Sequence, residues 1–445
     1  MRRQYAVTGC PEDGALNATD HPGSAPPRLT TIVRTGSPRR ETPVSHAHSH
    51  DHVDLPVDPQ IARSMWIAVG CCAVLVVIGL VALWPGSSSS TVDPLGLDGE
   101  PVPAEVVSVE VTPCSYDVLL GCRLIEIVPS EGPEIGERLT FEQGLDSPIR
   151  DGDSILVDIG TADDGSALIF FYDFQRSTPL LLLTLLFVAA IIVLGRWKGV
   201  GALAGLATSL MVIIAFVLPA VLEGSNAVLV ALVAAGAIAF LALFLAHGVN
   251  LATAAALLSS IASLAVTAVL AWLFVRFSNL TGLANESIGF LGALGTDINP
   301  EGLLLAGVVI GSLGVLDDVT VTQVSAVWEL KRARPDADMA DLYRRAVRIG
   351  RDHISSTVNT LFLAYAGAAL PLLLLFQEAG QSISSVATRE VVAVEIVRAL
   401  VGSIGLVASV PISTALAAAV VGSRIDPPAA TNTDTAVDWP APSHG

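Results

Sequence analysis

The chain of 445 residues is 52% hydrophobic and only 15% charged, and its 42 Asp and Glu against 24 Lys and Arg give a net charge of −18. So apolar a composition excludes an ordinary soluble globular protein and is typical of a polytopic membrane protein. The acidic balance is unsuited to nucleic acid, so we expect no nucleic-acid partner.

Residues 1–64 form an N-terminal tail rich in Pro, Ser, Thr and Gly, which predicts a disordered segment. Its Arg residues favour the cytoplasmic side, because basic residues next to membrane spans stay inside. The tail also carries four imidazoles at alternate positions: His46, His48, His50 and His52. Such a tract can bind zinc, nickel, copper or cobalt weakly, and the alternative is a solvated linker. No other cofactor is expected.

The first apolar run, residues 65–84, has the length of a transmembrane helix. A signal peptide would also be apolar, but this run follows a tail of 64 residues and precedes no convincing small-residue cleavage site. We therefore interpret it as an uncleaved anchor that exports the segment behind it.

Residues 91–176 form this exported segment and carry eighteen Asp and Glu against four Arg and no Lys, a net charge of −14. Alternating apolar and polar residues predict five short strands separated by turns. The pattern favours a small extracytoplasmic barrel of OB-like type. Cys114 and Cys122 flank a predicted hairpin and can pair on the oxidising side of the membrane, and the sequence leaves open whether they do.

Residues 178–423 contain seven further apolar runs: 180–194, 200–222, 227–246, 251–277, 302–328, 357–376 and 395–421. The sequence thus predicts an all-α polytopic membrane bundle of about eight transmembrane helices, with a small extracytoplasmic β-rich, OB-like domain inserted between helices 1 and 2. Basic residues between 329 and 353 favour the cytoplasm for that loop. Both termini, including a second disordered tail at 426–445, are then cytoplasmic. An apolar stretch at 288–294 adds the alternative of a re-entrant segment.

Asp317 and Asp318 interrupt the run 302–328. Carboxyl groups at that depth are costly unless they line a cavity, change protonation or bind a cation, so they indicate a functional site. From Asp318, polar residues recur at helical spacing and form one stripe: Thr322, Ser325 and Glu329. We also assign Gln323 to this ion or substrate pathway. In the first half of the span, three small residues would let another helix approach closely: Gly307, Gly311 and Gly314.

The following span begins with polar groups that would face this stripe across a shared cavity: His353, Thr357 and Asn359. A His near two carboxylates would fit a proton relay or a cation site. The alternative is that His353 lies at the lipid headgroups and that the hydroxyls bond to their own helix.

A third polar group lies at the start of the last span and consists of Glu390, Glu395 and Arg398. Glu395 and Arg398 are at i and i+3 of a predicted helix and are therefore able to pair. We interpret this group as helix-pairing rather than as part of the pathway.

Three segments resemble the YibE/F-like family of bacterial membrane proteins in its actinobacterial form: residues 314–330, 353–361 and 390–406. The first of them, with the Asp pair, reads GVLDDVTVTQVSAVWEL. The exported acidic segment is similar to that family's extracytoplasmic part, and the resemblance covers roughly residues 60–425. It implies a membrane permease of undefined substrate and supplies no established catalytic or binding residue.

We therefore expect a multi-pass permease of the bacterial cytoplasmic membrane, proton- or cation-coupled, that moves an unknown small solute or ion past the Asp pair. The alternative is a non-transporting assembly factor or sensor whose β domain binds an envelope partner. Besides the lipid bilayer, an envelope protein or a second copy of the chain is thus a candidate partner. An enzyme is not expected, because the spans contain no His/Glu metal motif, Gly-x-Ser-x-Gly elbow or Cys/His dyad.

Overall fold

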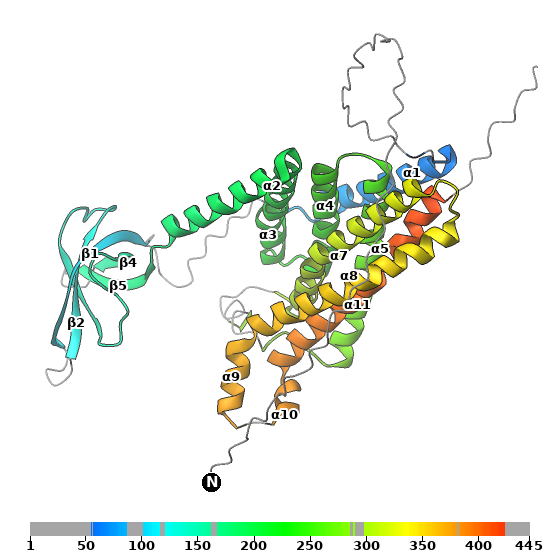
Figure 1. The fold of residues 1–445 in the computed structure, drawn as a ribbon. Helices are drawn as coiled ribbons and strands as arrows, with labels where there is room; N and C mark the ends of the chain where they lie inside the picture. The colour runs from blue at the N-terminus through cyan, green and yellow to red at the C-terminus, as the bar shows by residue number, and fades with distance from the viewer. Residues whose placement is uncertain are drawn as a thin grey trace, which may run out of the picture. The chain divides into compact units, whose positions relative to one another are not determined.

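The computed structural model of this chain describes residues 55, 57–86, 101–115, 121–161, 167–284, 288–289, 298–380 and 382–422. These residues form a β sheet and a set of helices (Figure 1). The His tract with His46, His48, His50 and His52, the tail at 426–445 and most of the suggested re-entrant segment lie outside the described ranges.

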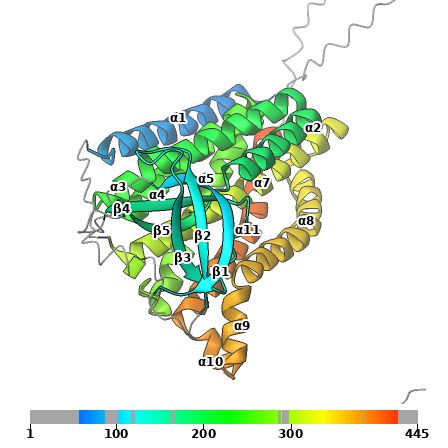
Figure 2. The ribbon, with the colours of Figure 1, turned by 90° about the vertical axis from the view of Figure 1, so that its left-hand side faces the viewer.

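Five antiparallel strands form one sheet in the order β3-β2-β1-β4-β5. Their bounds are β1 Val102–Pro113, β2 Gly121–Pro129, β3 Leu139–Gly144, β4 Ser154–Thr161 and β5 Ala167–Phe174. Alternate residues point to one face and bury a small apolar core that includes Val106, Ile125 and Val157. The sheet curls so that β3 contacts β5 (Figure 2). The predicted β-rich segment is thereby confirmed.

Polar and covalent links join the neighbouring strands of this sheet. Cys114 and Cys122 form a disulfide with an S–S distance of 2.01 Å. Glu126 of β2 accepts hydrogen bonds from Arg138 Nη1 at 2.8 Å and from Ser108 Oγ at 3.1 Å. The side-chain hydrogen bond from Arg138 lowers the pKa of Glu126 below the ordinary value of a glutamate, and the bond from Ser108 adds to the effect. The carboxylate therefore stays ionised at neutral pH.

The remaining elements are helical: α1 Pro59–Ala82, α2 Ser177–Val212, the π-helical turn η1 Ile213–Val217, α3 Leu218–Leu222, α4 Ala227–His247, α5 Leu251–Phe277, α7 Pro300–Ala333, α8 Met339–Ala368, α9 Leu370–Glu378, α10 Ile383–Ala387 and α11 Glu390–Val421. Three long helices, α4, α5 and α7, begin at an Asn whose side chain accepts from a backbone N–H of the first turn: Asn226, Asn250 and Asn299. In the described part of the chain, six helices are long and apolar enough to cross a membrane, or seven if the pair α8 and α9, bent by 57°, is one span. This fits a multi-pass membrane protein, as predicted.

The predicted count of eight spans is not confirmed, and the difference lies in one helical segment. The predicted spans 180–194 and 200–222 fall together into α2, η1 and α3, which are continuous over 46 residues. A straight helix of that length would be roughly 70 Å long, about twice the hydrocarbon thickness of a bilayer. The backbone is interrupted at Arg196, with φ 50° and ψ −132°. A Cβ on Gly199 would lie 2.5 Å from the Ile191 carbonyl oxygen, so the chain folds back tightly at this break.

Helices α5, α7 and α11 each pack against the other two and form the centre of the helical part. Arg276 at the end of α5 lies 3.8 Å from Glu301 at the start of α7, so these two helices run antiparallel. Helix α11 approaches α5 closely at Gly405, where a Cβ would overlap the hydroxyl of Thr267. Leucines along the first turns of α2 are exposed, which fits a surface in contact with lipid.

Candidate functional site

The two neighbouring aspartates of α7 lie in different surroundings. Asp317 is half-buried and its Oδ1 atom is shielded from solvent, whereas Asp318 is exposed. This difference follows from helix geometry, because successive residues are rotated by about 100° around the axis. Asp317 faces α5, and Asp318 lies on the side of α7 that the bundle does not cover.

Asp318 belongs to a continuous row of exposed residues, which we call the α7 stripe. Its members recur at intervals of three or four and are Gly307, Gly311, Gly314, Asp318, Thr322, Ser325 and Glu329. Thr322 Oγ1 donates to the carbonyl oxygen of Asp318 at 2.8 Å, and Glu329 pairs with Arg332. The stripe thus contains the polar residues predicted from spacing and continues them along the helix as a row of glycines.

Side chains from two other helices reach the glycine half of the stripe. A Cβ on Gly307 would lie 3.9 Å from Arg398 Nη2, and a Cβ on Gly311 would lie 3.8 Å from the hydroxyl oxygen of Tyr365. Arg398 Nη1 donates to Glu395 Oε1 at 2.7 Å, in an ion pair that is only partly exposed. The predicted pairing on α11 therefore forms, and Arg398 also borders the start of the stripe.

Glu390 makes a different set of contacts from the other members of its predicted group. Its Oε1 atom accepts from the backbone N–H of Thr281 at 2.6 Å and of Gly282 at 2.7 Å, and from the Thr281 hydroxyl at 2.8 Å. These residues follow the end of α5. Glu390 therefore attaches the segment after α5 to the start of α11.

Gln323 lies off the stripe, on the buried side of α7. Its Nε2 atom donates to the Ala346 carbonyl oxygen of α8 and to Thr414 Oγ1 of α11, each at 2.7 Å. Gly350 permits the approach, because a Cβ there would lie 2.7 Å from Gln323 Oε1. The amide thus connects three helices, which is a packing role rather than the position on the pathway that we predicted.

The polar residues at the predicted start of the next span show no contact with the Asp pair. His353 and Asn359 of α8 are exposed, and Thr357 donates to the His353 carbonyl oxygen at 3.0 Å. Within the described ranges, no hydrogen bond or ion pair joins them to Asp317 or Asp318. The Thr357 hydroxyl thus bonds to its own helix. This agrees with the alternative given above, in which the hydroxyls of this span bond within their helix.

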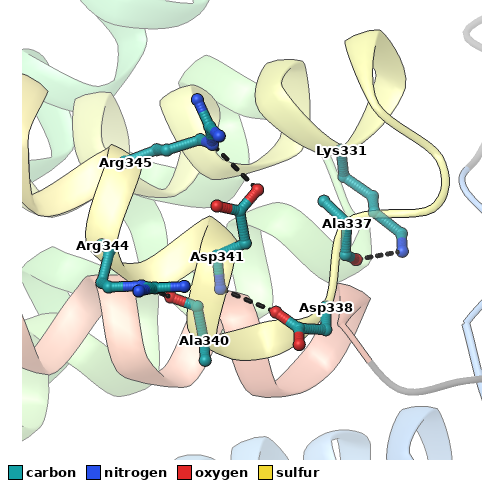
Figure 3. A network of polar contacts seen from close by, with 7 residues as sticks. All are labelled: Lys331, Ala337, Asp338, Ala340, Asp341, Arg344 and Arg345. Atoms are coloured by element: carbon teal, nitrogen blue, oxygen red, sulfur yellow. Dashed lines mark hydrogen bonds and ion pairs between the residues drawn. The ribbon is translucent and has the colours of Figure 1, made fainter.

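A compact polar turn joins α7 to α8 at the end of the stripe (Figure 3). Lys331 Nζ donates to the Ala337 carbonyl oxygen at 2.9 Å, and the Asp338 carboxylate caps α8 by accepting from the Asp341 N–H at 2.8 Å. Asp341 in turn pairs with Arg345 at 2.8 Å. These bonds fix the direction in which α8 leaves α7.

Sequence reasoning missed the polar residues that other helices contribute next to α7. Ser260 of α5 and Tyr365 of α8 are examples: no polar residue of α5 had been assigned to a site, and Tyr365 lies beyond the α8 residues that had been. A signal was available for α5, because Ser260, Ser263 and Thr267 recur at intervals of three and four within an otherwise apolar span.

A family model described as YibE/F-like protein matches residues 183–423, which is more than half of the chain. The chain belongs to the YibE/F-like protein family. The match to the YibE/F-like model includes the whole α7 stripe and the buried groups beside it. It begins inside α2, so α1 and the β sheet lie outside it, whereas we had expected the resemblance to begin near residue 60. No curated protein and no solved structure matches the chain.

Proposed function

We propose that this YibE/F-like protein is a multi-pass permease of the bacterial cytoplasmic membrane, coupled to protons or another cation. In this proposal a small solute or ion moves along the α7 stripe, and the protein has no enzymatic activity. The observation that carries the proposal is the stripe itself, in which seven exposed residues without a large apolar side chain run along one helix, with Asp318 at their centre.

The position of Asp318 along α7 indicates that the stripe is in contact with water in this proposal. The residue lies about 27 Å from the start of a helix of 34 residues, near the middle of its length. A carboxylate facing acyl chains at that depth would cost at least about 2.5–3.5 kcal/mol. A water-lined path along α7 removes this cost, and the neighbouring glycines and hydroxyls leave room and polar partners for a solvated cargo.

Charged groups border the stripe near both of its ends. Arg398, which pairs with Glu395, lies beside Gly307, and Glu329 lies at the opposite end of the stripe. Intramembrane ionisable residues of transporters commonly mark the route of an ion. The experiment that tests the proposal is a flux measurement on the purified full chain in sealed vesicles, with Asp318 replaced by Asn.

The proposed topology has eight crossings, with both termini in the cytoplasm. The fold-back at Arg196 supports it, because it divides the 46-residue segment into two pieces that each suit one crossing. The β segment is then extracytoplasmic, where a disulfide between Cys114 and Cys122 is stable. We infer an OB-like barrel for this segment, supported by the position of β1 between β2 and β4 and by the contact of β3 with β5.

A second candidate function is a sensor or assembly factor whose β segment binds an envelope protein. It is favoured by three exposed apolar side chains on alternate positions of the edge strand β5: Leu168, Phe170 and Tyr172. A row of exposed apolar side chains is a typical contact surface for another chain.

Site-specific cross-linking tests this second function in intact membranes. With a photoreactive side chain at Phe170, we expect a discrete adduct with one other protein, because the β5 face would be covered by the partner. The same group at Leu145, an exposed apolar residue after β3, should give none. Equal labelling at both positions, or lipid adducts alone, would remove the support for a protein partner.

A further inference from the structure

The buried side of α7 forms a second polar cluster, where it contacts α5. Ser260 Oγ lies 2.7 Å from Thr320 Oγ1, and the Thr320 hydroxyl donates to the carbonyl oxygen of Asp317 at 3.0 Å. Ser260, Thr320 and Ser263, one turn further along α5, are all 0% exposed.

Two oxygens of this cluster have no hydrogen-bond partner among the described residues, namely Asp317 Oδ1 and Ser263 Oγ. Other buried hydroxyls of α5 and α11 donate to a carbonyl oxygen of their own helix, as Ser259, Thr267 and Ser413 do. Buried polar atoms are nearly always satisfied, and each exception calls for an explanation. Two such oxygens in one cluster are available to a ligand that accepts electron pairs.

Helix packing brings these two oxygens to the same level. Thr320 lies level with Ser260, because their hydroxyls meet, and α5 and α7 run antiparallel. Asp317 is about one turn before Thr320 on α7, and Ser263 is about one turn after Ser260 on α5. Asp317 and Ser263 therefore lie level with each other along the contact between the two helices.

We propose that Asp317, Ser260, Ser263 and Thr320 bind a monovalent metal cation, Na⁺. All four donors are hard oxygens, which suit hard cations rather than thiophilic or imidazole-bound metals. The single carboxylate balances one positive charge, and among the described residues no group of three or more His, Cys, Asp or Glu could hold a metal ion. Its role as the coupling ion rests on the permease function proposed above, whereas its binding does not.

Equilibrium binding of ²²Na⁺ to the purified full chain in detergent tests this site. We expect saturable binding that choline does not displace, and loss of that binding in Asp317→Asn. Ser263→Ala should weaken binding by about tenfold, because it removes one donor without removing the charge. Ser259→Ala is the matched control, since this hydroxyl is equally buried on the same helix but donates to Ala255, and its affinity should equal that of the native chain.

The absence of saturable ²²Na⁺ binding in the native chain would overturn the site, as would native affinity in Ser263→Ala. Ser263→Ala keeps the test decisive if Asp317→Asn does not fold. Flux in a chain that binds no Na⁺ would overturn this inference and leave the permease function intact. Na⁺ binding in a chain without flux would support the cation site and overturn the permease function.

Discussion

Replacing Asp318 by Asn is expected to lower cation-dependent flux in sealed vesicles by roughly 100-fold, while the chain folds and inserts normally. A carboxylate attracts a cation 4 Å away by about 4 kcal/mol at an effective dielectric constant of about 20. If water around the cation compensates for about a third of this lost attraction in the variant, the uncompensated part corresponds to about two orders of magnitude in rate. The side chain is exposed and Asn has nearly the same shape, so folding is unaffected.

The matched control for this result is Asp336→Asn. Asp336 is also an exposed carboxylate, but it lies in the turn between α7 and α8, away from the middle of the helix. We expect native flux in this control. Equal flux in native chain and Asp318→Asn, measured at the same amount of inserted protein, would show that the stripe carries no cation.

Replacing Gly314 by Leu is expected to block flux nearly as strongly, for a steric reason. No atom lies within 4 Å of the position that a Cβ on Gly314 would take, so the larger side chain can be accommodated without disturbing the bundle. It would then occupy the stripe one turn from Asp318. In the proposed path, apolar volume one turn from Asp318 keeps a solvated ion away from the carboxylate, so we expect at least about a tenfold loss of flux.

Gly70→Leu provides the control for added volume. Gly70 lies in α1 and likewise has no atom within 4 Å of its Cβ position. Both variants should keep the thermal midpoint of the native chain in detergent, and only Gly314→Leu should lose flux. If Gly314→Leu transports at the native rate, the stripe faces lipid or another chain rather than a path.

Periodicity in the sequence was sufficient to predict those strands and helices that have one buried and one exposed face. Alternation predicted the five strands, because each has one buried and one exposed face. The three-and-four spacing from Asp318 to Glu329 predicted one helical face, and that face is exposed as a single row. Cys114 and Cys122 were visible as a candidate pair, although spacing alone could not decide between thiols and a disulfide.

Features that depend on contacts between helices could not be obtained this way. Asp317 and Asp318 are adjacent and equally polar, so only the packing of α5 against α7 reveals that one is buried and the other exposed. Gln323 was assigned to the same pathway, yet it lies about 140° around the helix from Asp318 and bonds to α8 and α11.

The helix count shows a similar limit. Hydropathy separated 180–194 from 200–222 at the charged residues between them, whereas the backbone keeps one helical segment and reverses it at Arg196. Whether such a segment crosses once or twice depends on the local dihedral angles of a single residue. Composition carries no information about these angles.

The most direct test of the central claim is the reactivity of single cysteines toward a membrane-impermeant thiol reagent in intact vesicles. The reactive species is the thiolate, which forms readily in water and not in lipid. With Cys10, Cys71 and Cys72 replaced by Ala, we expect rapid modification of Thr322→Cys and none of Leu186→Cys, an exposed position on the apolar α2. Equal resistance of Thr322→Cys and Leu186→Cys would contradict a water-lined path along α7.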